Sequence, residues 1–189
     1  MDWYALLWSA EPVSSAIQLI LNDKLKDISP DKVAKLTVLT RKSPSQEIED
    51  AFDVLTQLAR KKNGNFKDAV LQKAVADFQK RYFWIYNNYF ETKILQEEEI
   101  ILDVKRRLQK SEFNLAQNDS IAKIKVALIK ELKLDKETIN ILEISSDFIY
   151  WQDVRKKWIM IFAHYLDLLL KEIGERAGAS LRDMRYTLP

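Results

Sequence analysis

The sequence predicts an all-α protein: an irregular bundle of five to seven helices with one long helix near the carboxyl terminus. Apolar residues recur at helical spacings through most of the 189 residues, and only 3 Gly and 4 Pro interrupt them. With 47% hydrophobic and 31% charged residues, the chain can build a core, which excludes a disordered protein. We expect one helical domain over residues 1–189, with a sub-division allowed near 111–119.

The amino-terminal part predicts one clear helix and one ambiguous element. The first helix should cover residues 11–27, with Pro12 in an early position where its missing N–H costs little. A second short element starts at Ser29-Pro30. Its type stays open, because residues 37–40, Thr-Val-Leu-Thr, suit a strand as well as a helix.

The next helix has stronger signals at both ends. Ser43 can cap it, Pro44 can take its first position, and Gln46 can close a capping box. We expect it to run to Lys62 and to stop at Asn63-Gly64, a pair that favours the left-handed conformation.

Helical spacing continues from Phe66 to about Gln109. One helix of that length is improbable in a small domain, so we expect a bend or break near Asn87-Asn88. The segment Asn118-Asp-Ser120 should then cap a helix that runs to about Leu134.

The last long helix should open at Asp135 and end by Gly178, and Ser180 with Asp183 marks one more helix start. One stripe of this long helix alternates spacings of four and three: Ile144, Phe148, Trp151, Arg155, Trp158, Phe162, Tyr165 and Leu169. Such a stripe indicates a helix face that packs against partners.

Arg155 interrupts this apolar stripe. The favoured interpretation is an Arg stem packed on neighbouring rings with its guanidinium in solvent. The alternative is a buried fork that holds a phosphate or pins a neighbouring domain.

Aromatic residues cluster in the middle of the chain. Seven of the 20 aromatics fall within thirteen residues: Phe78, Tyr82, Phe83, Trp84, Tyr86, Tyr89 and Phe90. A smaller group lies near the start of the chain: Trp3, Tyr4 and Trp8. An aromatic-rich core is the favoured interpretation. A stacking platform for a base, or a small-molecule pocket that uses Trp84 and Trp151, is the functional alternative.

The residues needed for most catalytic sites are missing. Zero Cys excludes thiolate zinc sites and cysteine nucleophiles, and 3 Gly exclude a Gly-rich phosphate loop. The only histidine, His164, reads as a core or edge residue. Glu143 and Asp147 could form half of a carboxylate metal site, but the Glu-x-x-His partners are absent. We therefore assign no catalytic, cofactor-binding or metal-binding residue.

Charge and hydropathy also narrow the classes of partner that we expect. The formal charge is only +2 and its basic clusters are scattered, so we expect no nucleic-acid partner. The longest apolar run, residues 158–163, is far shorter than the roughly 20 residues that a bilayer needs, so we expect no membrane partner. The amino terminus lacks the basic region of a secretory signal, and a cytoplasmic location is expected.

Three segments carry a family resemblance. They are Phe78-Gln-Lys-Arg-Tyr-Phe-Trp-Ile-Tyr-Asn-Asn-Tyr89, the segment Ile149-Tyr-Trp-Gln-Asp-Val-Arg-Lys-Lys157, and residues 168–189. Together they resemble the all-helical middle region of phosphoenolpyruvate-utilising phosphotransferases, which include phosphoenolpyruvate synthase-like enzymes and rifampicin phosphotransferases. In that family a helical segment joins an ATP-grasp domain to a swivelling domain with a phosphoryl-carrying histidine.

The resemblance implies a structural role for this chain and no catalytic role. The ATP-binding loops and the histidine swivel motif of the family are missing here, and His164 lacks the neighbours of a carrier histidine. ATP and Mg are implied only for a parent enzyme. Arg155 and Asp153 fall on positions that the family pattern marks; with Trp84 and Trp151 they are our candidates for functional or interdomain contacts.

Two functions follow as hypotheses. The first is a non-catalytic helical connector that positions an ATP-binding domain relative to a phosphohistidine domain, with the other domains or subunits of a phosphotransferase as partners. The chain end, residues 186–189, reads as a cut at a domain boundary under this hypothesis. The alternative is a stand-alone helical protein–protein interaction module, which should expose an apolar patch.

Overall fold

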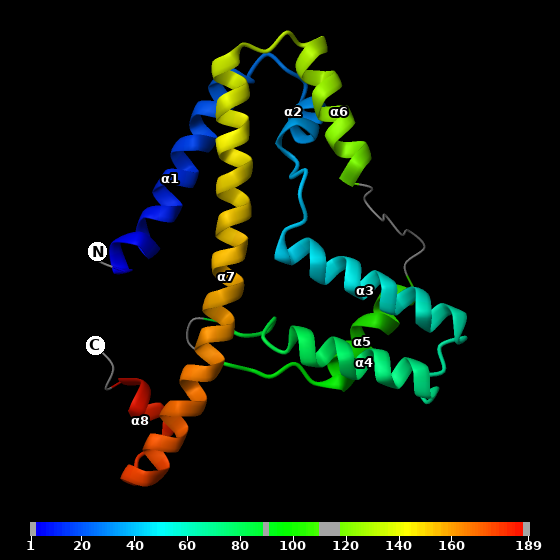
Figure 1. Cartoon of the computed structure of the whole chain (residues 1–189), viewed down its shortest axis with the longest axis vertical. Helices are drawn as coiled ribbons and strands as arrows, with labels where there is room; N and C mark the ends of the chain where they lie inside the picture. Colours follow the sequence, from blue (N-terminus) through cyan, green and yellow to red (C-terminus); the bar gives the residue numbers. More distant parts are fainter. Residues whose placement is uncertain (1–2, 89–90, 110–117, 187–189) are drawn as a thin grey trace. The chain divides into compact units, whose positions relative to one another are not determined.

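The computed structural model describes residues 3–88, 91–109 and 118–186, without the side chains of residues 3–11 and 118–120. Within these ranges the protein is all-helical, as predicted (Figure 1). The described residues form eight helices and no strand, one helix more than the predicted range allows. The last of the eight is short and follows the helix start that Ser180 and Asp183 predict.

The helices belong to two compact units. Unit 1 contains residues Met1–Glu47 and Asn114–Val154, and unit 2 contains Ile48–Phe113 and Arg155–Pro189. The sub-division expected near 111–119 falls largely on residues 110–117, outside the described ranges.

Unit 1 contains helices α1 (Trp3–Lys24), α2 (Pro30–Thr37) and α6 (Asn118–Glu131), and the first part of α7 (Lys136–Ala177). Its core is aliphatic: Leu21, Leu25, Leu36, Leu128 and Leu142. The second element, whose type the sequence left open, is the helix α2, which contributes the fully buried Leu36 to this core. Residues 38–40 belong to neither a helix nor a strand.

The predicted start of the first helix is wrong. The helix α1 begins at Trp3 rather than near residue 11, and Pro12 lies inside it. A proline removes one backbone N–H, but the residues ahead of Pro12 contain neither Gly nor Pro and can continue the helix on its other side.

Unit 2 contains most of α3 (Pro44–Lys61), with α4 (Ala69–Tyr82), α5 (Glu97–Leu108), the rest of α7 and α8 (Leu181–Tyr186). Its core is larger and richer in aromatic rings: Phe52, Leu55, Ala59, Leu71, Val75, Phe78, Tyr82, Trp84, Leu95, Ile100 and Val104. The aromatic-rich core interpretation is thereby confirmed for Phe78, Tyr82 and Trp84, whereas Tyr89 and Phe90 lie outside the described residues.

Local signals set the helix ends. The Ser43 N–H donates to Gln46 Oε1 at 3.0 Å and the Gln46 N–H to Ser43 Oγ at 3.4 Å, which confirms the predicted capping box. Asn63 and Gly64, with φ of 51° and 69°, form the predicted terminator after α3. The expected break in the middle of the chain lies between the end of α4 at Tyr82 and the start of α5 at Glu97.

The long helix α7 matches its predicted bounds closely. Its first turn is capped by Asp135, whose Oδ1 accepts a hydrogen bond from the Thr138 N–H at 2.6 Å. Its last turn is followed by Gly178 with φ of 69°, and the Ala179 N–H donates to the Gly174 carbonyl at 2.9 Å. This is the Schellman arrangement that commonly ends a helix at glycine.

Candidate functional site: the exposed apolar face of α7

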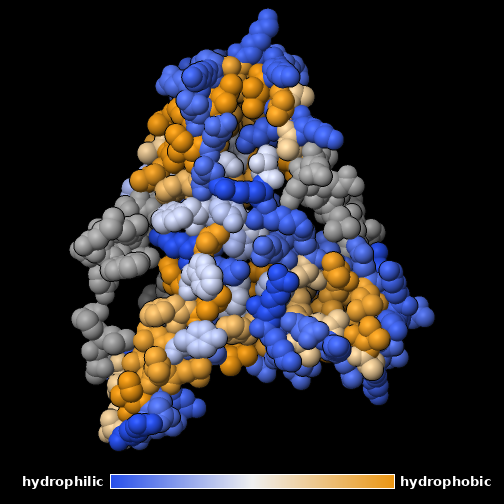
Figure 2. Space-filling view, viewed as in Figure 1, coloured by the Kyte–Doolittle hydropathy of each residue, from blue (hydrophilic) through white to orange (hydrophobic). Residues whose placement is uncertain are grey.

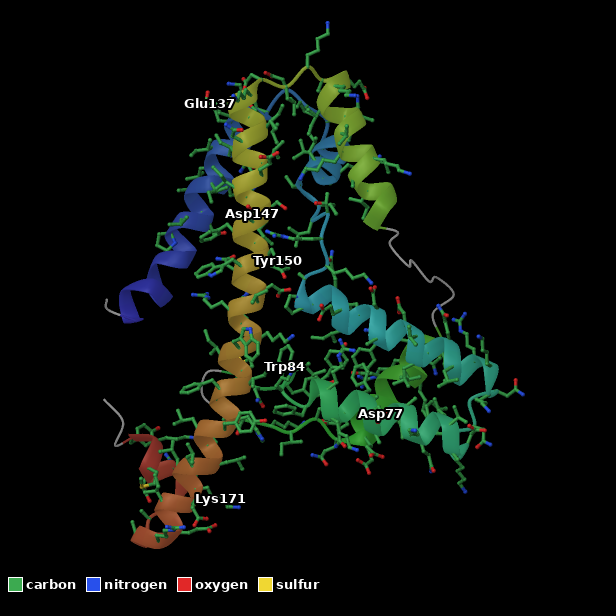
Figure 3. The ribbon with its side chains drawn as sticks, in the orientation of Figure 1. Asp77, Trp84, Glu137, Asp147, Tyr150 and Lys171 are labelled. Atoms are coloured by element: carbon green, nitrogen blue, oxygen red, sulfur yellow. The ribbon has the colours of Figure 1, made fainter. Side chains whose placement is uncertain are left out.

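The four candidate residues from the sequence are divided between the two units. Trp84 is 7% exposed and lies among the core side chains of unit 2 (Figure 3). Arg155 is half-buried in the same unit. Because the Trp84 ring is enclosed by its own core, it does not form an exposed stacking platform.

The two candidates in unit 1, Trp151 and Asp153, each contact other residues of the protein. Trp151 is 38% exposed and its ring lies 5.5 Å from that of Phe148. Asp153 accepts hydrogen bonds from the Ser45 N–H at 2.9 Å and from Ser45 Oγ at 2.7 Å. The Asp153 carboxylate therefore binds the first turn of α3, whose orphan N–H groups favour a negative charge.

The other titratable candidates also contact protein groups. Asp147 forms an ion pair with Arg41, and Glu143 acts on Lys125 through its charge. The ring of His164 packs edge-on against that of Phe83 at 4.8 Å, as expected for an edge histidine. In the described part of the chain, no cluster of three or more His, Asp or Glu could hold a metal ion.

A different surface stands out when α7 is followed through unit 2. One side of this helix faces the segment after α4. Met160 and Ile161 pack against the core, and the buried Asn87 side chain donates to the Met160 carbonyl at 2.9 Å while it accepts from the Lys93 N–H at 2.8 Å. Asn87 thus fixes α7 against the segment between α4 and α5.

A second side of α7 carries α8. Asp167 accepts hydrogen bonds from Arg185, at 2.9 Å from Nε, and from the Thr92 hydroxyl. Burial alone would raise the pKa of Asp167, but the hydrogen bonds from Arg185 and Thr92 outweigh it and hold the pKa below its usual value. A cavity of about 700 Å³ borders these residues, and its Asp167–Arg185 pair is already satisfied internally.

The third side of α7 is apolar and exposed. Five exposed residues at spacings of four, three, four and four form what we call the α7 stripe. They are Trp158 (61% exposed), Phe162 (64%), Tyr165 (55%), Leu169 (62%) and Ile173 (50%). The hydrophobic surface over this part of α7 is visible at the lower left of Figure 2. The stripe is about 22 Å long at 1.5 Å per residue.

The α7 stripe differs from the predicted one. The sequence predicts that the face containing Trp158, Phe162, Tyr165 and Leu169 packs against partners, but the described residues leave these side chains half to two-thirds exposed. Asp167 contacts α8 and Lys171 pairs with Glu175 at 3.9 Å on other sides of the helix. Glu172, three residues after Leu169, borders the stripe near its carboxyl end and pairs with Arg176 at 2.6 Å. An apolar face that is bordered by charge only near one end is suited to exclude water against another surface.

The size of the α7 stripe is considerable. Large aromatic side chains bury about 150–250 Å² each, so five large apolar side chains at these exposures present on the order of 600 Å². The largest apolar patch on a typical monomer is about 300–600 Å² and is often functional. The stripe therefore lies at the upper end of what a monomeric surface carries.

Comparisons with known proteins add no relative. No family model matches the sequence, and neither a curated protein nor a solved structure is significantly similar to the chain. Among the described helices, none combines the length and apolar character that crossing a membrane requires.

Proposed function

We propose that this protein is a helical protein–protein interaction module that binds its partner through the α7 stripe. The exposure of five large apolar side chains on one continuous helix face is the observation that carries the proposal. Trp and Tyr are enriched among the residues that dominate binding energy, and the stripe contains one of each. A cytoplasmic location is part of the proposal, since a chain without Cys suits a reducing compartment.

The apolar area sets only an upper limit on the binding free energy, because association costs about 4–15 kcal/mol in lost freedom, with further losses for ordered side chains. The affinity therefore depends on how closely the partner's surface matches the stripe.

Site-specific photo-crosslinking tests the proposal. A benzophenone side chain introduced at Phe162 reports what lies on the stripe in the source cells. Lys171 serves as the matched control, because it also lies on the unit 2 part of α7 (Figure 3). At 3.6 residues per turn it projects from a different side of the helix than the stripe. We expect protein adducts from position 162 and few from position 171.

The contrary result is also clear. Equal adduct yields at both positions, or no adduct at position 162 in a folded chain, would contradict binding through the α7 stripe. Circular dichroism of both variants establishes that the helices are intact before the yields are compared.

The connector of a phosphoenolpyruvate-type phosphotransferase is a second candidate, and the length of α7 favours it. A helix of 42 residues is about 63 Å long at 1.5 Å per residue. A rigid element of that length suits a part that sets the reach between a nucleotide site and a moving histidine domain. In a connector, the α7 stripe would contact a neighbouring domain of the same enzyme, and ATP and Mg would bind elsewhere in that enzyme.

The mass of the native polypeptide separates the two candidates. An antibody to this segment should detect a band several times 22.2 kDa in source cells if the chain is a connector. A band at the mass of this chain alone would contradict the connector and leave the interaction module.

A further inference from the structure

We infer that the partner of the α7 stripe is a second copy of this chain, with the two α7 helices antiparallel across a two-fold axis near Tyr165. This inference rests on the proposed function, because it names the occupant of the same surface. Two features of the stripe support it: the order of its side chains and its area.

The order of side chains makes the stripe self-complementary. Its first part is aromatic, with Trp158, Phe162 and Tyr165, and its second part is aliphatic, with Leu169 and Ile173. Trp158 and Ile173 lie equally far from the midpoint between Tyr165 and Leu166, and so do Phe162 and Leu169. A two-fold axis at this midpoint therefore places Trp158 opposite Ile173 and Phe162 opposite Leu169 of the other copy, with the two Tyr165 side chains next to each other at the axis.

A parallel arrangement lacks this fit. It would place Trp158 opposite Trp158 and Phe162 opposite Phe162, with the smaller aliphatic side chains facing each other at the other end. Bulky residues would then separate the helices at one end, whereas close packing requires large residues to face smaller ones.

The area suits a dimer. Two stripes of on the order of 600 Å² each bury about 1,200 Å² in total. Stable, specific interfaces bury about 1,200–2,000 Å², and crystal-packing contacts mostly stay below about 800 Å². The α7 stripe alone thus reaches the lower limit of a specific interface, and residues at its flanks add to it.

Cysteine cross-linking measures the register directly, because the chain contains no natural Cys. Tyr165→Cys should cross-link to itself with a short bismaleimide, since this position lies at the two-fold axis. Trp158→Cys should not cross-link to itself, but should cross-link when mixed with Ile173→Cys. Lys171→Cys is the exposed control and should give no product.

Solution mass completes the test. Multi-angle light scattering of the unmodified chain should give twice 22.2 kDa at high concentration.

Two results would overturn the inference. A monomeric mass at every concentration excludes the second copy, and self-cross-linking of Trp158→Cys shows a parallel register. If the chain is monomeric but a benzophenone at position 162 still links to another protein, the inference fails and the proposed function stands. If neither the dimer nor an adduct forms, both fail.

Discussion

Asp167 joins three parts of unit 2 through one carboxylate. It lies on α7 and accepts hydrogen bonds from Thr92, in the segment before α5, and from Arg185 on α8. Because its pKa in the folded protein lies below the usual value, the stability that the ionised Asp167 carboxylate adds to the fold is fully present above about pH 4. The contribution is lost as the pH falls through the lowered pKa.

Asp167→Asn should remove this pH dependence. The amide keeps the size of the side chain but loses the charge that pairs with Arg185, so we expect α8 to detach more readily by about 1–2 kcal/mol at neutral pH. Hydrogen exchange of the α8 amides, followed from pH 6 to pH 3, measures the effect. The prediction is contradicted if the unmodified chain and the variant lose α8 protection over the same pH range.

Lys125 gives a prediction of opposite sign. It is only 8% exposed on α6; burial lowers its pKa, and the charge of Glu143 offsets this in part. A buried cation with incomplete compensation destabilises the fold, so Lys125→Met should increase the free energy of unfolding by about 1 kcal/mol. Urea denaturation at pH 7 tests it, with the exposed Lys123→Met as control; a decrease would show that the pair with Glu143 outweighs burial.

Single residues show where sequence reasoning works and where it stops. Trp84 and Trp158 both lie at apolar helical spacings, yet one is 7% exposed and the other 61%. Periodicity identifies a helix face but not whether another element covers that face. Asp167 was missed because its partners, Thr92 and Arg185, are distant in sequence and neither forms a motif with it.

At the scale of elements, caps and terminators were the reliable signals. The capping box at Ser43, the terminator at Asn63-Gly64 and the bounds of α7 were predicted correctly, because each depends on a few neighbouring residues. The start of α1 was not, because Pro12 is a typical first-turn residue and the sequence does not show that the helix continues before it.

The contact between α7 and α8 depends on one glycine. A Cβ at Gly174 would lie 2.7 Å from the carbonyl oxygen of Ala179 and 3.0 Å from Cγ of Met184. In a helix interior, alanine is normally more favourable than glycine by about 1 kcal/mol. Here the clash involves backbone, so the added methyl group must displace the chain that leads into α8.

Gly174→Ala should therefore weaken α8 rather than strengthen α7. We expect faster hydrogen exchange in residues 181–186, with the amides of α7 before residue 170 unchanged. Ala177→Gly, on the same last turn but without such a contact, is the control for a general change in helix propensity. Increased protection in α8 would contradict the steric argument.

At the scale of the whole molecule, the two hydrophobic cores share no residue among those that the structure describes. The core of unit 1 is aliphatic, and that of unit 2 contains four aromatic rings. The sequence predicts enough apolar residues for a core but does not divide them, because the helices of each unit come from distant parts of the chain. Such a division depends on tertiary contacts that no local pattern encodes.

Separate cores predict separate responses to mutation. Leu71→Ala removes a fully buried side chain from unit 2 and should cost about 2–5 kcal/mol, and Leu142→Ala should do the same in unit 1. Substitutions without shared partners act independently, and local unfolding follows cooperative units. Hydrogen exchange should then show lost protection in α4 and α5 for Leu71→Ala, with α2 and α6 unchanged, and the converse for Leu142→Ala. Equal loss in both units from either substitution would mean that α7, which runs through both, couples them into one cooperative fold.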